Sequence, residues 1–108
     1  MKLYWIRKYG ELHLEKCLDL EPGNSTAYMN LGTIHLQNQE IEDAISEFTQ
    51  AIRLNPYDAS FYLARGYVYS QVKDSTRAIS DLNQVMKFSE DSQLRQAVQQ
   101  RLNWYASS

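Results

Sequence analysis

The chain has 108 residues, which is the usual length of one compact domain. Hydrophobic residues make up 44% and charged residues 22%, proportions that are typical of a globular protein and exclude a disordered, highly charged chain. With a formal net charge of -2 the sequence has no basic footprint for nucleic acid or an anionic membrane, and no apolar run approaches the roughly 20 residues that cross a bilayer.

The N-terminal residues 1–7 are too few and too polar for a secretory signal. Cys17 is the only cysteine, which excludes an internal disulfide and fits a reducing, cytoplasmic location. Lys2, Arg7 and Lys8 stand among aromatic residues, but this basic cluster is short and acidic residues follow it. We therefore expect neither nucleic-acid binding nor membrane binding.

The first clear helix is predicted over residues 25–38, where apolar side chains recur every three or four positions. Asn24 and Ser25 can both cap its start with a side-chain oxygen. A second helix is predicted over 41–54, after a break at 38–40, and Pro56 cannot continue it. Its inward side chains are expected to be Ile41, Ala44, Ile45, Phe48, Ala51 and Ile52.

The same pattern returns at a fixed offset, since Pro22 and Pro56 are 34 residues apart and Gly32 is matched by Gly66. The second copy predicts helices over 59–71 and 75–88, with Asp58 and Asp74 as caps. Small residues should let the paired helices approach closely. They are Gly32, Ala44, Ala51, Gly66 and Ala78.

Residues 92–105 form the last predicted helix, which we interpret as a capping helix over the second copy. Its outer face is rich in glutamine, as the terminal unit of a stack requires. Its apolar stripe consists of Leu94, Ala97, Val98, Leu102 and Tyr105.

The repeat also extends backwards, so that residues 1–24 are interpreted as the second half of an incomplete first unit. Because the partner helix of this unit is missing, the aromatic side chains of Tyr4, Trp5 and Tyr9 must be buried by some other contact. The N-terminal segment packs back, or a second copy of the chain covers it as a homodimer, or the sequence is a piece of a longer array.

Four runs carry the repeat: AYMNLG at 27–32, DAISEF at 43–48, AIRLNP at 51–56 and RAISDL at 77–82. The pattern resembles the tetratricopeptide repeat (TPR) family from about residue 10 to 88. The resemblance implies an all-α fold, a right-handed α-solenoid of antiparallel helix pairs. It divides a single domain, 1–108, into a partial first repeat (1–24), repeats at 25–58 and 59–91, and a C-terminal capping helix (92–108).

Four positions depart from the family pattern. Arg65 stands where a leucine is expected, and Glu90 stands where a proline is expected. Gln39 and Lys73 replace the common turn glycine. None of these residues breaks a helix, so the predicted fold is unaffected.

Few residues suit catalysis or metal binding. His13 has carboxylates only at positions that face other sides of a helix, and His35 takes the packing position of Tyr69. Cys17 occupies a core position that Ala51 fills in the next copy. No phosphate-binding loop or paired-cysteine spacing occurs. We therefore expect no enzyme activity, no catalytic residues, no metal site and no cofactor.

The resemblance implies that the first helix of each pair lines a concave, partner-binding face. Because that face would carry amides, hydroxyls and a few apolar side chains but no charge, it suits a peptide or helix of another protein. The predicted binding residues are Met29, Asn30, Thr33, Leu36, Gln37, Leu63, Ala64, Tyr67, Ser70 and Gln71.

Some family members clamp the terminal carboxylate of a peptide with Lys, Arg and Asn on these helices. Here Met29, Thr33 and Ala64 occupy three of those places, and only Asn30 resembles a clamp residue. We expect no carboxylate clamp. The leading prediction is therefore a protein-binding adaptor or scaffold, and the alternative is a self-assembling, homodimeric module that uses its incomplete N-terminal repeat.

Overall fold

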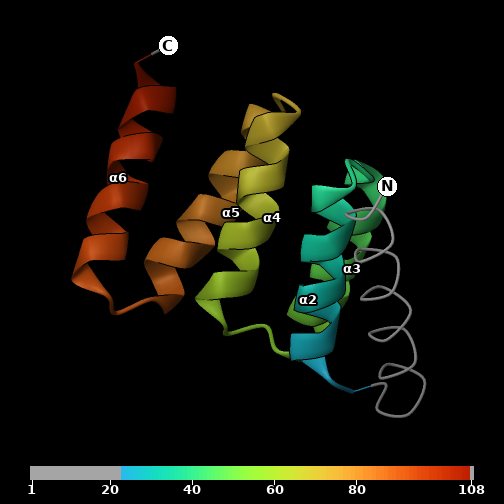
Figure 1. The fold of residues 1–108 in the computed structure, drawn as a ribbon. Coiled ribbons are helices and arrows are strands. Elements are labelled where there is room, and N and C mark those ends of the chain that lie inside the picture. The colour runs from blue at the N-terminus through green and yellow to red at the C-terminus, as the bar shows by residue number, and fades with distance from the viewer. Residues whose placement is uncertain (1–22, 108) are drawn as a thin grey trace. The chain divides into compact units, whose positions relative to one another are not determined.

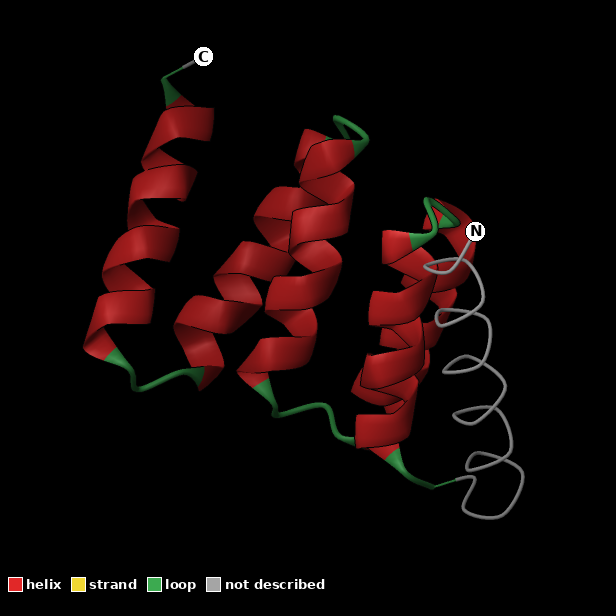
Figure 2. Cartoon of the chain, in the orientation of Figure 1, coloured by secondary structure: helices red, strands yellow, loops and turns green. Residues whose placement is uncertain are grey.

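The computed structural model describes residues 23–107, and every regular element in this range is an α-helix. The chain forms two compact units, of which one ends at Pro56 and the next begins at Tyr57. Figures 1 and 2 show the helices of each unit. The first contains α2 (Ser25–Gln37) and α3 (Ile41–Leu54), and the second contains α4 (Ala59–Gln71), α5 (Ser75–Phe88) and α6 (Ser92–Ala106).

The all-α prediction is confirmed, and the predicted helix ends agree with the observed ones to within one residue. The predicted caps explain this agreement. The side chain of Asn24 accepts a hydrogen bond from the backbone N–H of Ala27, and Asp74 accepts one from Arg77. Each cap satisfies an N–H group that has no partner inside the helix.

The turns inside the two helix pairs use left-handed backbone. Gln39 has φ 63° and Lys73 has φ 62°, in a region that L-residues enter at a cost. These are the two positions where the resemblance noted in the sequence implies a turn glycine. The backbone still closes both turns, since the N–H of Glu40 donates to the carbonyl of His35 and that of Asp74 donates to Tyr69.

The core of the first unit lies where α2 meets α3. A Cβ atom on Gly32 would come within 2.6 Å of the Phe48 ring, and that ring is only 1% exposed. The helices therefore approach closely at a residue without a side chain. Ala44 and Ala51 are fully buried beside Phe48, whereas Ile41, Ile45 and Ile52 are half-buried.

The second unit repeats this arrangement with α4 and α5. Ala78, Val68 and Val85 have no exposed surface, and Gly66 lies against the Cβ of Asp81. Tyr57 and Tyr62 contact the ring of Phe88 at centroid distances of 5.6 and 5.8 Å. These contacts join the start of α4 to the end of α5.

The helix α6 packs on α5, and two sets of hydrogen bonds hold its start in place. Asp91 accepts hydrogen bonds from the backbone N–H groups of Gln93 and Leu94. Arg95 donates to the carbonyl oxygens of Met86 and Ser89 at the end of α5. Such bonds satisfy carbonyls that the helix end leaves unpaired.

The predicted apolar stripe of α6 is only partly covered in the second unit. Val98 is 3% exposed, but Leu94, Leu102 and Tyr105 are half-buried and Ala97 is exposed. The stripe therefore leaves apolar surface open on one side of α6. Among residues 23–107, no helix has the length and apolar character that a membrane crossing requires.

Candidate functional site

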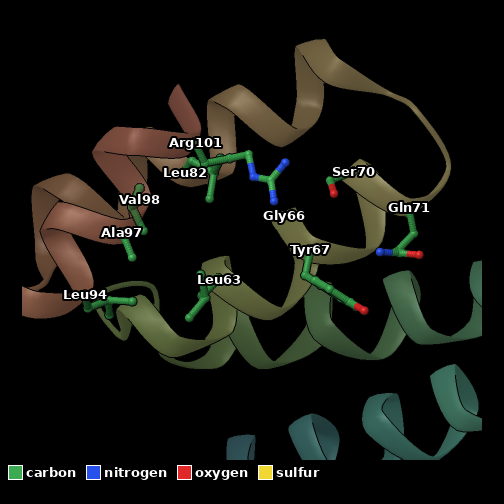
Figure 3. Close-up of a pocket in the computed structure, with 10 residues that line it drawn as sticks. All are labelled: Leu63, Gly66, Tyr67, Ser70, Gln71, Leu82, Leu94, Ala97, Val98 and Arg101. Atoms are coloured by element: carbon green, nitrogen blue, oxygen red, sulfur yellow. The ribbon is translucent and has the colours of Figure 1, made fainter. Parts of the chain in front are cut away.

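A hollow of about 210 Å³ opens in the second unit between α4 and α6, with α5 beneath it (Figure 3). Apolar side chains line it together with hydroxyl, amide and guanidinium groups. Helix α4 contributes Leu63, Gly66, Tyr67, Ser70 and Gln71, α5 contributes Leu82, and α6 contributes Leu94, Ala97, Val98 and Arg101.

Four of the five binding residues predicted on α4 line this hollow: Leu63, Tyr67, Ser70 and Gln71. Ala64 is half-buried and does not line it. Tyr67 is 54% exposed, so that much of its side chain is open to solvent.

The contribution of α6 was missed at the sequence level, because this helix was treated only as a cap. The repeat offset contains the missing signal. Shifting Leu63, Ala64 and Tyr67 by 34 residues gives Ala97, Val98 and Arg101, and all three line the hollow. Leu63 and Tyr67 line the hollow as well, whereas Ala64 does not, so the last helix repeats part of the pattern of a first helix.

The five binding residues predicted on the first copy lie along α2. Asn30, Thr33 and Gln37 are exposed, while Met29 and Leu36 are half-buried. The hydroxyl of Thr33 donates to the carbonyl oxygen of Met29, so its proton is used inside the helix. Thr33 can therefore offer a partner only its oxygen lone pairs.

Arg101 is the cation of the hollow. Its side chain extends from α6 across the hollow towards α4 (Figure 3), and its guanidinium carbon lies 5.4 Å from the centroid of the Trp104 ring. A second hollow of about 290 Å³ shares Ala97 and Arg101 and continues to Gln100 and Trp104. The polar groups beside Arg101 are thus continuous with a further open surface along α6.

Arg65 forms a buried ion pair with Asp81, which explains why a charged residue occupies a leucine position. Two guanidinium nitrogens of Arg65 lie 2.9 and 2.8 Å from the two carboxylate oxygens of Asp81, and Asp81 is 2% exposed. The rings of Tyr62 and Tyr69 flank the cation at 6.0 and 5.8 Å. This is a structural contact within the α4–α5 pair.

The hydrogen bond to Asp81 raises the pKa of Arg65 above its ordinary value, although burial opposes the rise. A raised pKa means that the stabilising contribution of the charged Arg65 is complete below the ordinary pKa of arginine and is lost only as the pH rises through the still higher pKa of the folded state. The guanidinium therefore remains charged throughout the physiological range.

His35 is buried, as predicted, but it has a neighbour that the sequence spacing did not suggest. Its Nδ1 atom lies 3.4 Å from Oε1 of Glu40, and one oxygen of Asp43 completes a group of three ligand-type atoms within 4.8 Å of one another. The turn at 38–40 folds the start of α3 back onto His35. The imidazole–carboxylate contact stabilises that turn. The predictions for His13, Cys17, Tyr4, Trp5 and Tyr9 concern residues outside the described range.

Solved structures share this fold. The TPR domain of Arabidopsis OM64 superposes with a TM-score of 0.78 at 18% identity, covering 88% of this chain and 78% of that one. YrrB, a TPR protein with an unusual peptide-binding site, gives 0.77 at 17% identity, and the match covers 87% of this chain but only 48% of YrrB. The first TPR of Spaghetti (RPAP3), bound to an HSP90 peptide, SRMEEVD, gives 0.75 at 18% identity, with 88% and 77% covered.

No curated protein matches the sequence significantly. Models of the tetratricopeptide repeat match residues 13–46 and 59–92, and a TPR repeat model matches 32–72, so that the matches together run from 13 to 92. They cover both observed helix pairs, and the second match coincides with the second predicted copy. The chain therefore belongs to the tetratricopeptide repeat family.

Proposed function

We propose that this chain is a protein-interaction module that binds a peptide or helix of a partner protein on the exposed faces of its first helices. The observation that carries this proposal is the hollow between α4 and α6, because its lining combines apolar side chains with a few polar groups. Binding sites commonly have this composition, since apolar contact supplies affinity and polar groups fix orientation.

The size of the hollow suits one large apolar side chain. A cavity of about 150 Å³ holds a benzene ring, and this hollow is about 210 Å³. Burying a leucine or methionine side chain contributes about 1.5–3 kcal/mol, whereas micromolar affinity requires about 8 kcal/mol. The remaining affinity must come from other contacts, such as main-chain bonds to Ser70 and Gln71 and apolar contact with Tyr67.

Two structural neighbours support the proposal that the chain binds a peptide. YrrB is described by its peptide-binding site, and the Spaghetti (RPAP3) domain was solved with a bound peptide. The family and its fold typically serve protein interaction rather than catalysis. We propose the corresponding role here and assign no catalytic residue.

The mode of binding that we propose excludes a carboxylate clamp. Met29 and Thr33 on α2 and Ala64 on α4 replace the charged and amide groups that such a clamp uses. Amidation of a bound peptide's C-terminus should therefore leave its affinity unchanged. A large loss of affinity on amidation, measured by fluorescence polarisation, would refute this part of the proposal.

Filling the hollow tests the binding site. Peptides are selected from a random displayed library against the full chain, synthesised, and titrated against Ala97→Trp, in which the new ring occupies the hollow. The matched control is Gln96→Trp, since Gln96 is exposed on the same helix but does not line the hollow. We expect the affinity of Ala97→Trp for the peptide to fall about tenfold or more, because the loss of one apolar anchor removes about 1.5 kcal/mol of binding free energy. The affinity of Gln96→Trp should stay unchanged. Equal affinity for both variants, or the selection of no peptide at all, would contradict the proposal.

A further inference from the structure

We infer that Arg101 makes the hollow selective for a partner segment in which an acidic side chain lies close to an apolar side chain, both inside the segment and not at its terminus. The inference rests on the proposed function and names the chemistry of the segment. The apolar side chain enters the hollow between Leu63, Ala97 and Val98, and the carboxylate of its neighbour meets Arg101.

The charge of Arg101 has no compensating carboxylate in the described part of the chain. Helix α6 carries Arg95 and Arg101 but no Asp or Glu. Arg95 is occupied by carbonyl oxygens at the end of α5, and Arg65 is paired with Asp81. Arg101 contacts the Trp104 ring and forms no ion pair within residues 23–107. A guanidinium in this position is complementary to a carboxylate brought by a partner.

The surroundings of Arg101 strengthen that complementarity. Its side chain extends across the hollow towards α4, where Ser70 and Gln71 offer uncharged hydroxyl and amide groups (Figure 3). A partner side chain that fills the hollow displaces water from beside Arg101. The ion pair between Arg101 and a partner carboxylate is then stronger, because charge pairs are stronger where water is excluded. A lysine or arginine at the same place in a partner would meet a like charge and would be disfavoured.

The carboxylate is expected to come from a side chain inside the partner, not from its terminus. The second hollow begins at Ala97 and Arg101 and continues along α6 to Gln100 and Trp104. Open surface on the far side of Arg101 leaves room for the partner chain to continue past the ion pair. The exposed ring of Trp104, at 56%, provides contact area for those further residues.

Selection from a random peptide library tests this specificity. The full chain, Arg101→Glu and Arg77→Glu are each used as bait, with the peptides displayed so that no free C-terminus is available. Arg77 is the matched control because it is an exposed arginine on α5 that does not line either hollow, and the same substitution changes the net charge equally. The selected peptides are synthesised and titrated at low and high salt.

We expect the full chain and Arg77→Glu to enrich Asp or Glu beside an apolar residue, and Arg101→Glu to enrich Lys or Arg instead. Arg101→Gln should weaken the peptides selected by the full chain about tenfold, and high salt should reduce that difference. Apolar enrichment without an acidic preference, or an acidic preference that survives in Arg101→Glu, overturns the inference and leaves the proposed function standing. Selection of no peptide by the full chain contradicts the proposed function, and the inference falls with it. Synthesised peptides that bind with a free C-terminus but not with an amidated one would overturn the assignment to an internal side chain.

Discussion

The pair formed by Arg65 and Asp81 shows how one residue can depart from a family pattern without changing the fold. Asp81 is almost fully buried against Gly66, and an unpaired carboxylate there would be costly. Arg65 places both carboxylate oxygens within hydrogen-bonding distance of its guanidinium. Arg65 and Asp81 therefore act as a pair, and the effect of changing one depends on the other.

Arg65→Leu, which restores the residue expected in the family, should lower the free energy of unfolding by about 3 kcal/mol, because it leaves a buried charge without a partner. Chemical denaturation followed by circular dichroism measures the loss. The double variant Arg65→Leu with Asp81→Ala should recover most of it, since no buried charge remains. If the single variant were as stable as the parent chain, the ion pair would have no structural role.

At the residue scale, the sequence predicted which small residues lie where two helices pack closely in the core, but it did not predict the polar contacts. The repeat offset identified Gly32 and Ala44 as contact positions, since small residues recur where helices cross. It could not predict that Glu40 lies beside His35, because the left-handed turn at Gln39 decides that contact. Nor could it predict that Arg65 forms an ion pair with Asp81.

At the scale of elements, the turn inside each helix pair carries backbone strain at a known position. Lys73 has φ 62°, where a Cβ atom is unfavourable and glycine is free to adopt the conformation. Lys73→Gly should raise the free energy of unfolding by about 0.5–1 kcal/mol, measured by chemical denaturation. Lys73→Ala is the control, because it removes the charge but keeps Cβ. A gain in the alanine variant equal to that in glycine would show that the side chain, not the backbone, is responsible.

The helix α6 depends on its cap more than the other helices do, because Val98 is its only buried residue. Asp91→Ala removes an acceptor for two backbone N–H groups and should cost α6 about 1 kcal/mol. Compared with the parent chain, the variant should therefore show faster hydrogen exchange in α6, with little change in α4 and α5. Glu90→Ala, at the adjacent exposed position, should leave exchange unchanged. Faster exchange spread equally over all three helices would contradict this account.

Element boundaries were predictable because strong local signals mark them. Asn24, Asp58 and Asp74 stand one residue before their helices, and Pro56 ends the first copy. The role of α6 was not predictable from its composition, because its glutamine-rich face is typical of a cap. Its equivalence to a first helix follows only from the offset that relates Tyr67 to Arg101.

At the scale of the whole molecule, the homodimer remains a prediction. It concerns Tyr4, Trp5 and Tyr9, which lie outside the described residues. Sedimentation of the full chain over a range of concentrations tests it, and Trp5→Ala should weaken association if these aromatic residues form the contact. A monomer mass that does not change with concentration would count against the homodimer and would leave the peptide-binding proposal untouched.

The central claim is that the face formed by α4 and α6 holds a segment of another protein. The most direct measurement is a titration of the isotopically labelled full chain with a selected peptide, followed by backbone NMR. The account predicts that the largest shift changes cluster at Leu63, Tyr67, Ser70, Ala97 and Arg101, and that Ala97→Trp requires about tenfold more peptide to produce the changes at the other four residues. Changes confined to the side of α5 that carries Arg77 and Ser80, or none at saturating peptide, would contradict it.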